Sequence, residues 1–205
     1  MERLGGRVRD AAAVVTGGRS RAATPLAAAV QSELRDLGMP DARIEIALVP
    51  LGEIGASGAE RPEIGFSAGE NQPVLPLAKV ASGGELSRAM LALRSVLVDL
   101  DDVPTLVFDE VDAGIGGRVA EIVGQMLKKL GKRHQVMCVT HLPQVAASAD
   151  HQWQVSKGAA KGAVTSRVTV LAADERVEEI ARMLGGVKIT DTTRRHAAEM
   201  LGVKS

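Results

Sequence analysis

Two adjacent carboxylates follow a short, mostly apolar run near the middle of the chain. Asp109 and Glu110 come directly after residues 105–108 (TLVF), whose types favour a β-strand. Such a run is typical of a buried parallel strand, and open α/β sheets bind ligands at the carboxyl ends of their strands. Because successive residues of a strand point to opposite faces, the two carboxylates are expected to do different work. One suits a hydrated Mg²⁺ ion, which prefers oxygen ligands, and the other suits polarising a water molecule. A strand that simply runs into a polar loop is the alternative.

A glycine turn before an amphipathic helix is the second feature with ligand-binding chemistry. Ser82 suits the N-cap of this helix. Gly83 and Gly84 let backbone N–H groups approach an anion at the helix N-terminus, where the helix dipole favours negative charge. The helix is predicted from apolar residues at three- and four-residue steps: Leu86, Met90, Leu93, Val96 and Leu100. A helix cap without any ligand is the alternative for Ser82.

His141 belongs to a third stretch of this kind. It follows a strand predicted at residues 135–139, so it also lies just past the carboxyl end of a strand. A single histidine more often has a structural role, and we assign structural or surface positions to His134, His151 and His196. Three strand-end or helix-start features in this order nevertheless favour one shared site.

These stretches resemble a known family. Residues 77–88 (LAKVASGGELSR), 107–117 (VFDEVDAGIGG) and 139–146 (VTHLPQVA) look like the C-terminal half of the RecN family of bacterial DNA repair proteins. Members of this family are SMC-like ATPases of the ATP-binding-cassette type. Residues 179–186 and 189–201 resemble the end of the same proteins. The likeness is continuous from about residue 44 to residue 201, whereas the first forty residues match only in character.

The resemblance implies a head-to-head dimer that sandwiches two ATP molecules. The segment formed by Ser82, Gly83, Gly84 and Glu85 would face the nucleotide held by the opposite head. Ser82 Oγ and the Gly84 amide would contact its γ-phosphate. Asp112 would lie in the loop that touches the other head.

The resemblance also divides the chemistry among the strand-end residues. Asp109 would hold Mg²⁺ through water, Glu110 would act as general base or orient the attacking water, and His141 would sense the γ-phosphate. This division fits phosphoryl transfer, which depends mainly on positioning and on stabilising charge.

The element that holds ATP phosphates is missing from the sequence. A P-loop has the pattern GxxxxGK[ST], but the chain's one Gly-Lys pair, Gly131-Lys132, is followed by Arg133. In the family this loop lies N-terminal to the coiled-coil arm. We therefore expect ATPase activity only together with an N-terminal half of the head, and we expect the isolated chain to be inactive. The chain is then a truncated protein or the second of two separately encoded parts.

Two other functions stay open. A transporter-type nucleotide-binding subunit is the rival among enzymes, although residues 111–114 (VDAG) look more SMC-like. A non-catalytic head-like module that binds DNA or a partner is the rival from another class, against which the intact Glu110 speaks. The partners that the family implies are the N-terminal half of the head, a second head, and DNA through the full-length protein.

Composition excludes few functions. The 205 residues carry 25 basic and 25 acidic side chains, so no overall positive field indicates DNA binding. With Phe66, Phe108 and Trp153 as the only aromatic residues, stacking on bases is not expected. The single cysteine, Cys138, is predicted to be a buried thiol and suits a reducing, cytoplasmic setting. No membrane span or membrane partner is predicted.

The order of elements predicts an α/β fold. We expect the C-terminal lobe of an ABC/SMC-type ATPase head, with a mainly parallel sheet flanked by helices, an antiparallel hairpin and C-terminal helices. Residues 1–40 are assigned to the end of a coiled-coil arm and residues 41–205 to the head lobe. Within the arm we expect a helix over residues 22–37, with residues 1–20 weakly ordered. The other predicted elements are strands at 44–49 and 64–66, helices at 115–130, 174–184 and 190–201, a short helix from Pro143, and a hairpin over 153–170.

Overall fold

A computed structural model describes residues 2–80, 82–100, 102–160, 163–186 and 188–203. These residues form two compact units, 1–101 and 102–205, and each unit has its own architecture. The predicted boundary near residue 40, between an arm and a head lobe, stays a prediction. No helix in the described ranges is long and apolar enough to cross a membrane.

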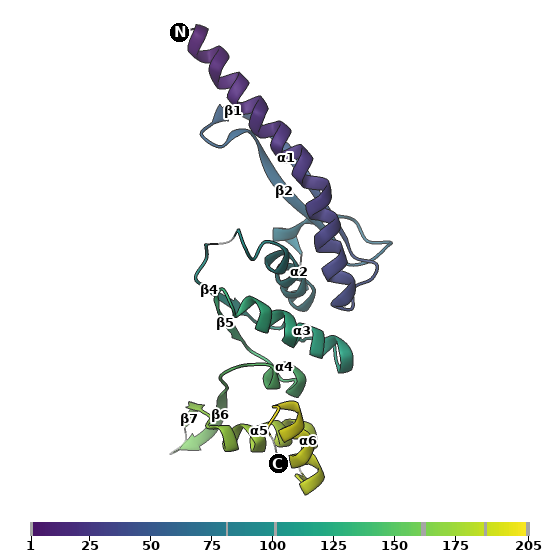
Figure 1. Cartoon of the computed structure of the whole chain (residues 1–205), viewed down its shortest axis with the longest axis vertical. Helices are drawn as coiled ribbons and strands as arrows, with labels where there is room; N and C mark the ends of the chain where they lie inside the picture. Colours follow the sequence, from purple (N-terminus) through teal and green to yellow (C-terminus); the bar gives the residue numbers. More distant parts are fainter. Residues whose placement is uncertain (1, 81, 101, 161–162, 187, 204–205) are drawn as a thin grey trace. The chain divides into compact units, whose positions relative to one another are not determined.

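The first unit is a long helix packed along a twisted antiparallel sheet. Helix α1 (Glu2–Asp36) runs beside the hairpin of β1 (Arg43–Gly55) and β2 (Gly58–Ser67), as Figure 1 shows. Strand β3 (Leu75–Pro76) pairs with the other edge of β2 and leads into the 3₁₀ turn η1 (Leu77–Lys79). Helix α2 (Gly83–Val96) follows and confirms the predicted helix after the glycine turn.

The prediction that residues 1–20 are weakly ordered is wrong. Helix α1 begins at Glu2, since alanine and arginine are strong helix formers and contacts with β2 hold the helix in place. Thr16 Oγ1 donates to the Glu60 carboxylate at 2.7 Å, and Arg19 Nη1 donates to the Glu60 carbonyl at 2.8 Å. Farther along α1, the predicted helix over residues 22–37 is confirmed, and Val30 and Leu34 are completely buried.

Strand β1 also continues beyond Pro50, where the sequence predicted its end. The pairing with β2 keeps register up to Pro50, opposite Glu60, and then shifts before Gly55. Proline is tolerated in a strand at an irregularity of this kind, where its missing N–H breaks no regular ladder hydrogen bond.

The second unit begins with the parallel pair that carries the strand-end residues. Strand β4 (Thr105–Phe108) pairs in parallel with β5 (Gln135–Cys138), as predicted. Helix α3 (Gly117–Leu130) connects them and buries the stripe Ala120, Val123, Met126, Leu127 and Leu130. The short helix α4 (Pro143–Ala147) follows β5 and contacts α3.

We predict that Gly124→Ala destabilises this contact between α3 and α4. A β-carbon at position 124 would lie 2.9 Å from Ser148 Cβ and 3.1 Å from the Gln144 carbonyl oxygen, so the two helices would have to separate. Overpacking typically costs about 1–3 kcal/mol, more than the gain in helix propensity of about 1 kcal/mol. Urea denaturation followed by circular dichroism should show a lower free energy of unfolding. Gly6→Ala in α1, with no atom within 4 Å of the added carbon, is the control and should stabilise. Equal stability of the two variants would contradict the prediction.

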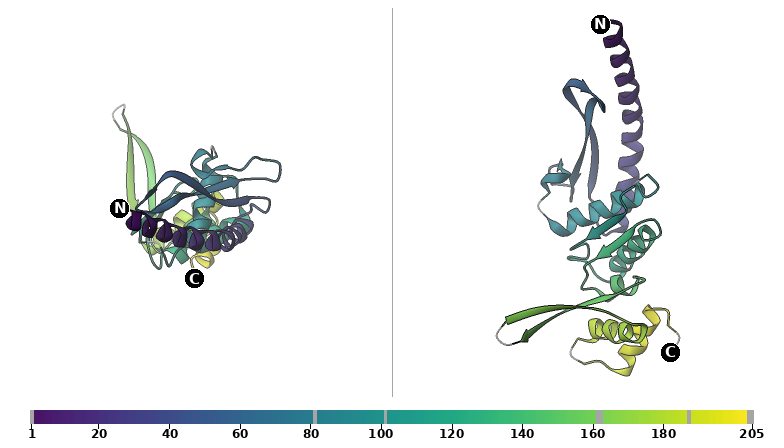
Figure 2. Two further views of the ribbon diagram at one scale, coloured as in Figure 1. Left: turned by 90° about the horizontal axis from the view of Figure 1, so that it is seen from above. Right: turned by 90° about the vertical axis from the view of Figure 1, so that its left-hand side faces the viewer.

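A hairpin and two helices complete the second unit. Strands β6 (Trp153–Ala160) and β7 (Ala163–Val170) form the predicted antiparallel hairpin, whose tip at residues 161–162 lies outside the described residues. Figure 2 shows it extending beyond α5 (Ala173–Gly185) and α6 (Asp191–Met200). These two helices pack through a core of Ile180, Ala181 and Ala197, which also takes in Ala146 of α4.

Local polar contacts fix α5. The N-cap of this helix is Ala172, whose amide donates to Glu175 at 2.7 Å, and Asp174 lies in the first turn. Glu179, which is buried, accepts hydrogen bonds from Arg182 at 2.7 Å and from Gln154 of β6 at 2.6 Å. The hydrogen bond from Arg182 lowers the pKa of Glu179, so this contact loses strength as the pH falls through that lowered value.

Candidate functional site

The two adjacent carboxylates lie at the carboxyl end of β4, as predicted. Asp109 and Glu110 are both exposed, directly after the buried Phe108. Asp109 Oδ1 accepts a hydrogen bond from the Glu110 amide at 2.9 Å, which ties its carboxylate to the start of the turn. The Glu110 carbonyl then accepts from the Ala113 amide at 3.0 Å. A tight turn therefore presents both side chains at the strand end.

The backbone of Glu110 adopts a conformation that side chains other than glycine rarely take. Its φ is +56°, and it is the one non-glycine residue with positive φ in the described part of the chain. A left-handed residue of this kind costs roughly 1–3 kcal/mol, and such strain gathers at active sites and ligand clamps. Glycine or asparagine would adopt this backbone conformation at a lower free-energy cost. The strain at this position makes Glu110 a candidate functional residue.

Asp112 differs from these two carboxylates because it is buried, with 2% of its surface exposed. Its Oδ2 atom accepts hydrogen bonds from Thr140 Oγ1 and from the His141 amide, the latter at 3.0 Å. The same oxygen lies 3.2 Å from His141 Nδ1. The structure thus brings two of the predicted site residues, Asp112 and His141, into direct contact across the ends of β4 and β5.

Thr140 is the residue of this network to which the sequence assigned no role. Besides donating to Asp112, its hydroxyl oxygen accepts from the Leu142 amide at 3.0 Å. Threonine commonly forms such a bond with the backbone two residues on. A threonine directly before His141 is therefore a sequence feature that could have predicted this turn. The partner at Asp112 could not be found this way, because it lies 28 residues away in the sequence.

The glycine turn belongs to the other unit, so the structure does not place it relative to Asp109, Glu110, Asp112 or His141. Ser82 is the N-cap of α2 and its backbone carbonyl accepts from Leu86, but its side chain makes no cap hydrogen bond. Ser82 and Gly83 are exposed, Gly84 is buried, and Glu85 lies in the first helical turn. The exposed hydroxyl beside a helix N-terminus fits an anion-binding turn better than a plain cap.

Arg88 anchors the other end of this turn in the core of the first unit. It is buried, and its Nε lies 3.5 Å from Met39 Sδ. Burial lowers the pKa of Arg88, while the negative charge of Glu85 opposes that shift. The residue therefore joins the motif at residues 82–85 to the segment that follows α1.

Cys138 at the end of β5 is not a nucleophile. Burial, together with the negative charges of Asp112 and Asp109, raises the pKa of this thiol to about 12. The thiol therefore stays protonated and unreactive near neutral pH. This agrees with the structural role that the sequence predicted, although the residue is only half-buried.

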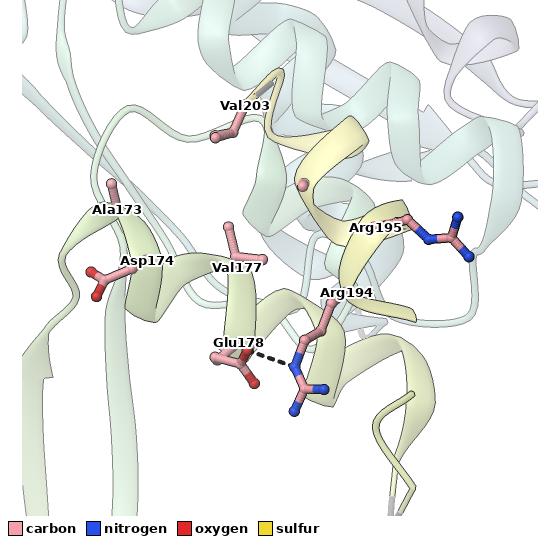
Figure 3. Close-up of a pocket in the computed structure, with 8 residues that line it drawn as sticks. Ala173, Asp174, Val177, Glu178, Arg194, Arg195 and Val203 are labelled. Atoms are coloured by element: carbon pink, nitrogen blue, oxygen red, sulfur yellow. Dashed lines mark hydrogen bonds and ion pairs between the residues drawn. The ribbon is translucent and has the colours of Figure 1, made fainter. Parts of the chain in front are cut away.

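A shallow apolar hollow between α5 and α6 is a second concave feature, with a volume of about 550 Å³ (Figure 3). Val177, Ala198 and Val203 line it, and Arg194 lies at its edge. Arg194 donates to Glu178 at 2.7 Å, and this hydrogen bond raises its pKa. The ion pair gives Arg194 a structural task, namely joining the two helices. Asp174, Glu178 and Arg195 also line the hollow, and we assign it no catalytic role.

Comparison with known proteins gives a consistent result, although no protein-family model matches the chain. The DNA repair protein RecN of Xylella fastidiosa strain 9a5c is 47% identical over 195 residues, which is 94% of this chain and 35% of that protein. RecN of Deinococcus radiodurans is 48% identical over 183 residues, or 89% of this chain and 32% of that protein. The chain thus spans about a third of the length of these curated relatives.

Among solved structures, the fold is similar to that of SMC heads. The Smc head domain with a coiled coil and joint from Pyrococcus yayanosii has a TM-score of 0.53 and 21% identity. That match covers 76% of this chain and 28% of the other. The predicted class, a lobe of an ABC/SMC-type head, is confirmed at the level of the fold.

Proposed function

The chain belongs to the RecN family of DNA repair proteins, and we propose that it is the C-terminal part of an ATPase head that hydrolyses ATP between two heads during recombinational repair of double-strand breaks. Because the chain spans about a third of its relatives, the activity and partners of the whole protein are part of this proposal. So is a cytoplasmic, nucleoid-associated location.

The strained glutamate is the observation that carries the proposal. Glu110 holds an exposed carboxylate at the end of a parallel strand at a conformational cost, directly after Asp109. A non-catalytic module, the rival function, would have no use for that cost. The transporter-type rival is disfavoured by identities of 47% and 48% to RecN proteins.

The residues present fit Mg²⁺ held together with a nucleotide. No group of three or more histidine, cysteine, aspartate or glutamate side chains arranged to hold a metal exists among the described residues. Mg²⁺ usually binds through one or two carboxylates together with water and phosphate oxygens, so Asp109 alone is enough on the protein side. Asp109 would hold the ion, whose chemistry is to offset the negative charge of the phosphates.

The other site residues would position the γ-phosphate and polarise the attacking water. Glu110 would accept a proton from the attacking water or orient it, and His141 would lie toward the γ-phosphate and that water. The exposed Ser82 hydroxyl and the amides at the start of α2 would contact the γ-phosphate bound to a second head. Hydrolysis would then require two heads to close on the same nucleotide.

Exposed apolar side chains on the parallel pair support the proposal that another part of the head packs against it. Val107 of β4, Met137 of β5 and Val139 just after it are exposed on the face of the parallel pair opposite the buried Leu106 and Phe108. Parallel strands are normally covered on both faces. We propose that the amino-terminal, P-loop-containing half of the head covers this face.

A second exposed stripe lies on α1. Leu4, Val8 and Val15 follow one another at steps of four and seven residues and are exposed. This spacing is that of a coiled-coil seam. It supports residues 1–40 as the end of a coiled-coil arm, with a second helix as the partner.

We predict that the purified 205-residue chain hydrolyses ATP at a negligible rate, because no P-loop is present to hold the phosphates. Co-expression with the amino-terminal half of a RecN head should give a reconstituted head with magnesium-dependent ATPase activity, measured by phosphate release. The Glu110→Gln chain in the same preparation controls for a contaminating ATPase. Robust hydrolysis by the isolated chain, or none by a well-folded reconstituted head, would refute the proposed function.

A further inference from the structure

Asp112 and His141 are in contact, although they lie in two different turns of the chain. Asp112 lies in the turn after β4, and His141 lies in the turn after β5. One carboxylate oxygen, Asp112 Oδ2, accepts from Thr140 Oγ1 and the His141 amide and lies 3.2 Å from His141 Nδ1. The two strand-end turns are therefore joined at a single buried atom.

We propose that Asp112 is a positioning residue that holds His141 as the Nδ1–H tautomer and leaves Nε2 to face the ligand. A carboxylate oxygen 3.2 Å from Nδ1 favours a proton on that nitrogen, because a carboxylate can only accept a hydrogen bond and would repel a lone pair. The bond made by one ring nitrogen determines the state of the other. Nε2 then lies on the opposite edge of the ring, and the His141 side chain is 69% exposed.

The burial of Asp112 makes this arrangement rigid. With only 3% of its side chain exposed, the carboxylate has little competition from water for its donors. Thr140 donates to it and also accepts from the Leu142 amide, so the turn on both sides of His141 is fixed. A change in the turn that follows Glu110 would therefore move His141 as well.

The tautomer can be measured on the chain as it stands. In ¹⁵N-labelled protein at about pH 8.5, above the ordinary histidine pKa of about 6.5, ring ¹⁵N shifts separate the two neutral tautomers. His141 should be the Nδ1–H form in the wild type and should change toward Nε2–H in Asp112→Ala. If Asp112→Ala does not fold, Asp112→Asn replaces it, because its amide NH₂ can turn toward Nδ1. An Nε2–H wild type, or an unchanged tautomer in the Asp112 variant, would overturn the proposal.

Thr140→Val separates positioning from simple support of the turn. It removes one donor to Asp112 and the acceptor for Leu142 but leaves the contact with Nδ1, so stability should fall while the tautomer stays. A tautomer lost equally in Thr140→Val would mean that Asp112 acts only by supporting the turn.

The activity test of this inference rests on the proposed function, whereas the tautomer test does not. In the reconstituted head, Asp112→Asn should lower kcat about 10–100-fold, as loss of an orienting partner commonly does, with KM changed less than about twofold. An unchanged kcat would contradict the positioning role. A wild-type head without ATPase activity would refute the proposed function instead, and the tautomer result would stand.

Discussion

Glu110→Gln should reduce ATP turnover by about 10²–10⁴-fold in a head reconstituted with its P-loop half, while ATP binding is retained. Glutamine keeps the length and shape of the side chain but cannot accept a proton. Because ATP would still bind but not be cleaved, the ATP-bound dimer should accumulate. Phosphate release measures the turnover, and equilibrium binding of a fluorescent ATP analogue measures the affinity. An unchanged rate would remove Glu110 from the mechanism.

Glu110→Gly tests the same residue through the backbone. With φ at +56°, position 110 suits glycine better than glutamate, so this variant should lose turnover without losing stability. Urea denaturation of the isolated chain gives the comparison. A marked loss of stability in Glu110→Gly would mean that the glutamate side chain supports the fold. The strain would then have no functional explanation.

The elements that could be predicted from the sequence are those in which local pattern and tertiary packing agree. Strand β4, strand β5 and helix α3 come from short apolar runs or a regular apolar stripe in the sequence, and each lies within two residues of its predicted range. The first turns of α1 could not be predicted, because their glycine pairs suggested disorder. Farther along the helix, the contact of Thr16 with Glu60 in β2 joins residues that lie 44 positions apart in the sequence.

The same distinction holds for the site. The location of Asp109, Glu110 and His141 just past strand ends could be predicted, because each closely follows an apolar run in the sequence. The buried state of Asp112 could not be predicted, since its hydrogen bonds join two turns 28 and 29 residues apart. Nor could the φ of Glu110, because nothing in a glutamate's type indicates a left-handed conformation.

Ser82→Arg should abolish ATP-induced dimerisation and, with it, hydrolysis, while leaving the fold intact. Ser82 is exposed and its hydroxyl makes no cap hydrogen bond, so the change should alter stability by no more than about 0.5 kcal/mol. A long cation at this point would block the approach of a γ-phosphate to the amides at the start of α2. The Glu110→Gln head, in which the dimer accumulates, is the background in which light scattering measures this loss best.

Two matched variants show whether position or charge causes the effect. Ser32→Arg adds the same cation at an exposed position of α1 and should leave dimerisation unchanged. Ser82→Ala removes only the hydroxyl, so it should weaken dimerisation without blocking it. If Ser82 were merely a helix cap, Ser82→Ala would instead lower the free energy of unfolding by about 1 kcal/mol and dimerisation would persist in Ser82→Arg. That pattern would refute a contact between Ser82 and the nucleotide of the opposite head. A residue that contacts nucleotide only between two heads should affect dimerisation and leave the stability of the single chain unchanged.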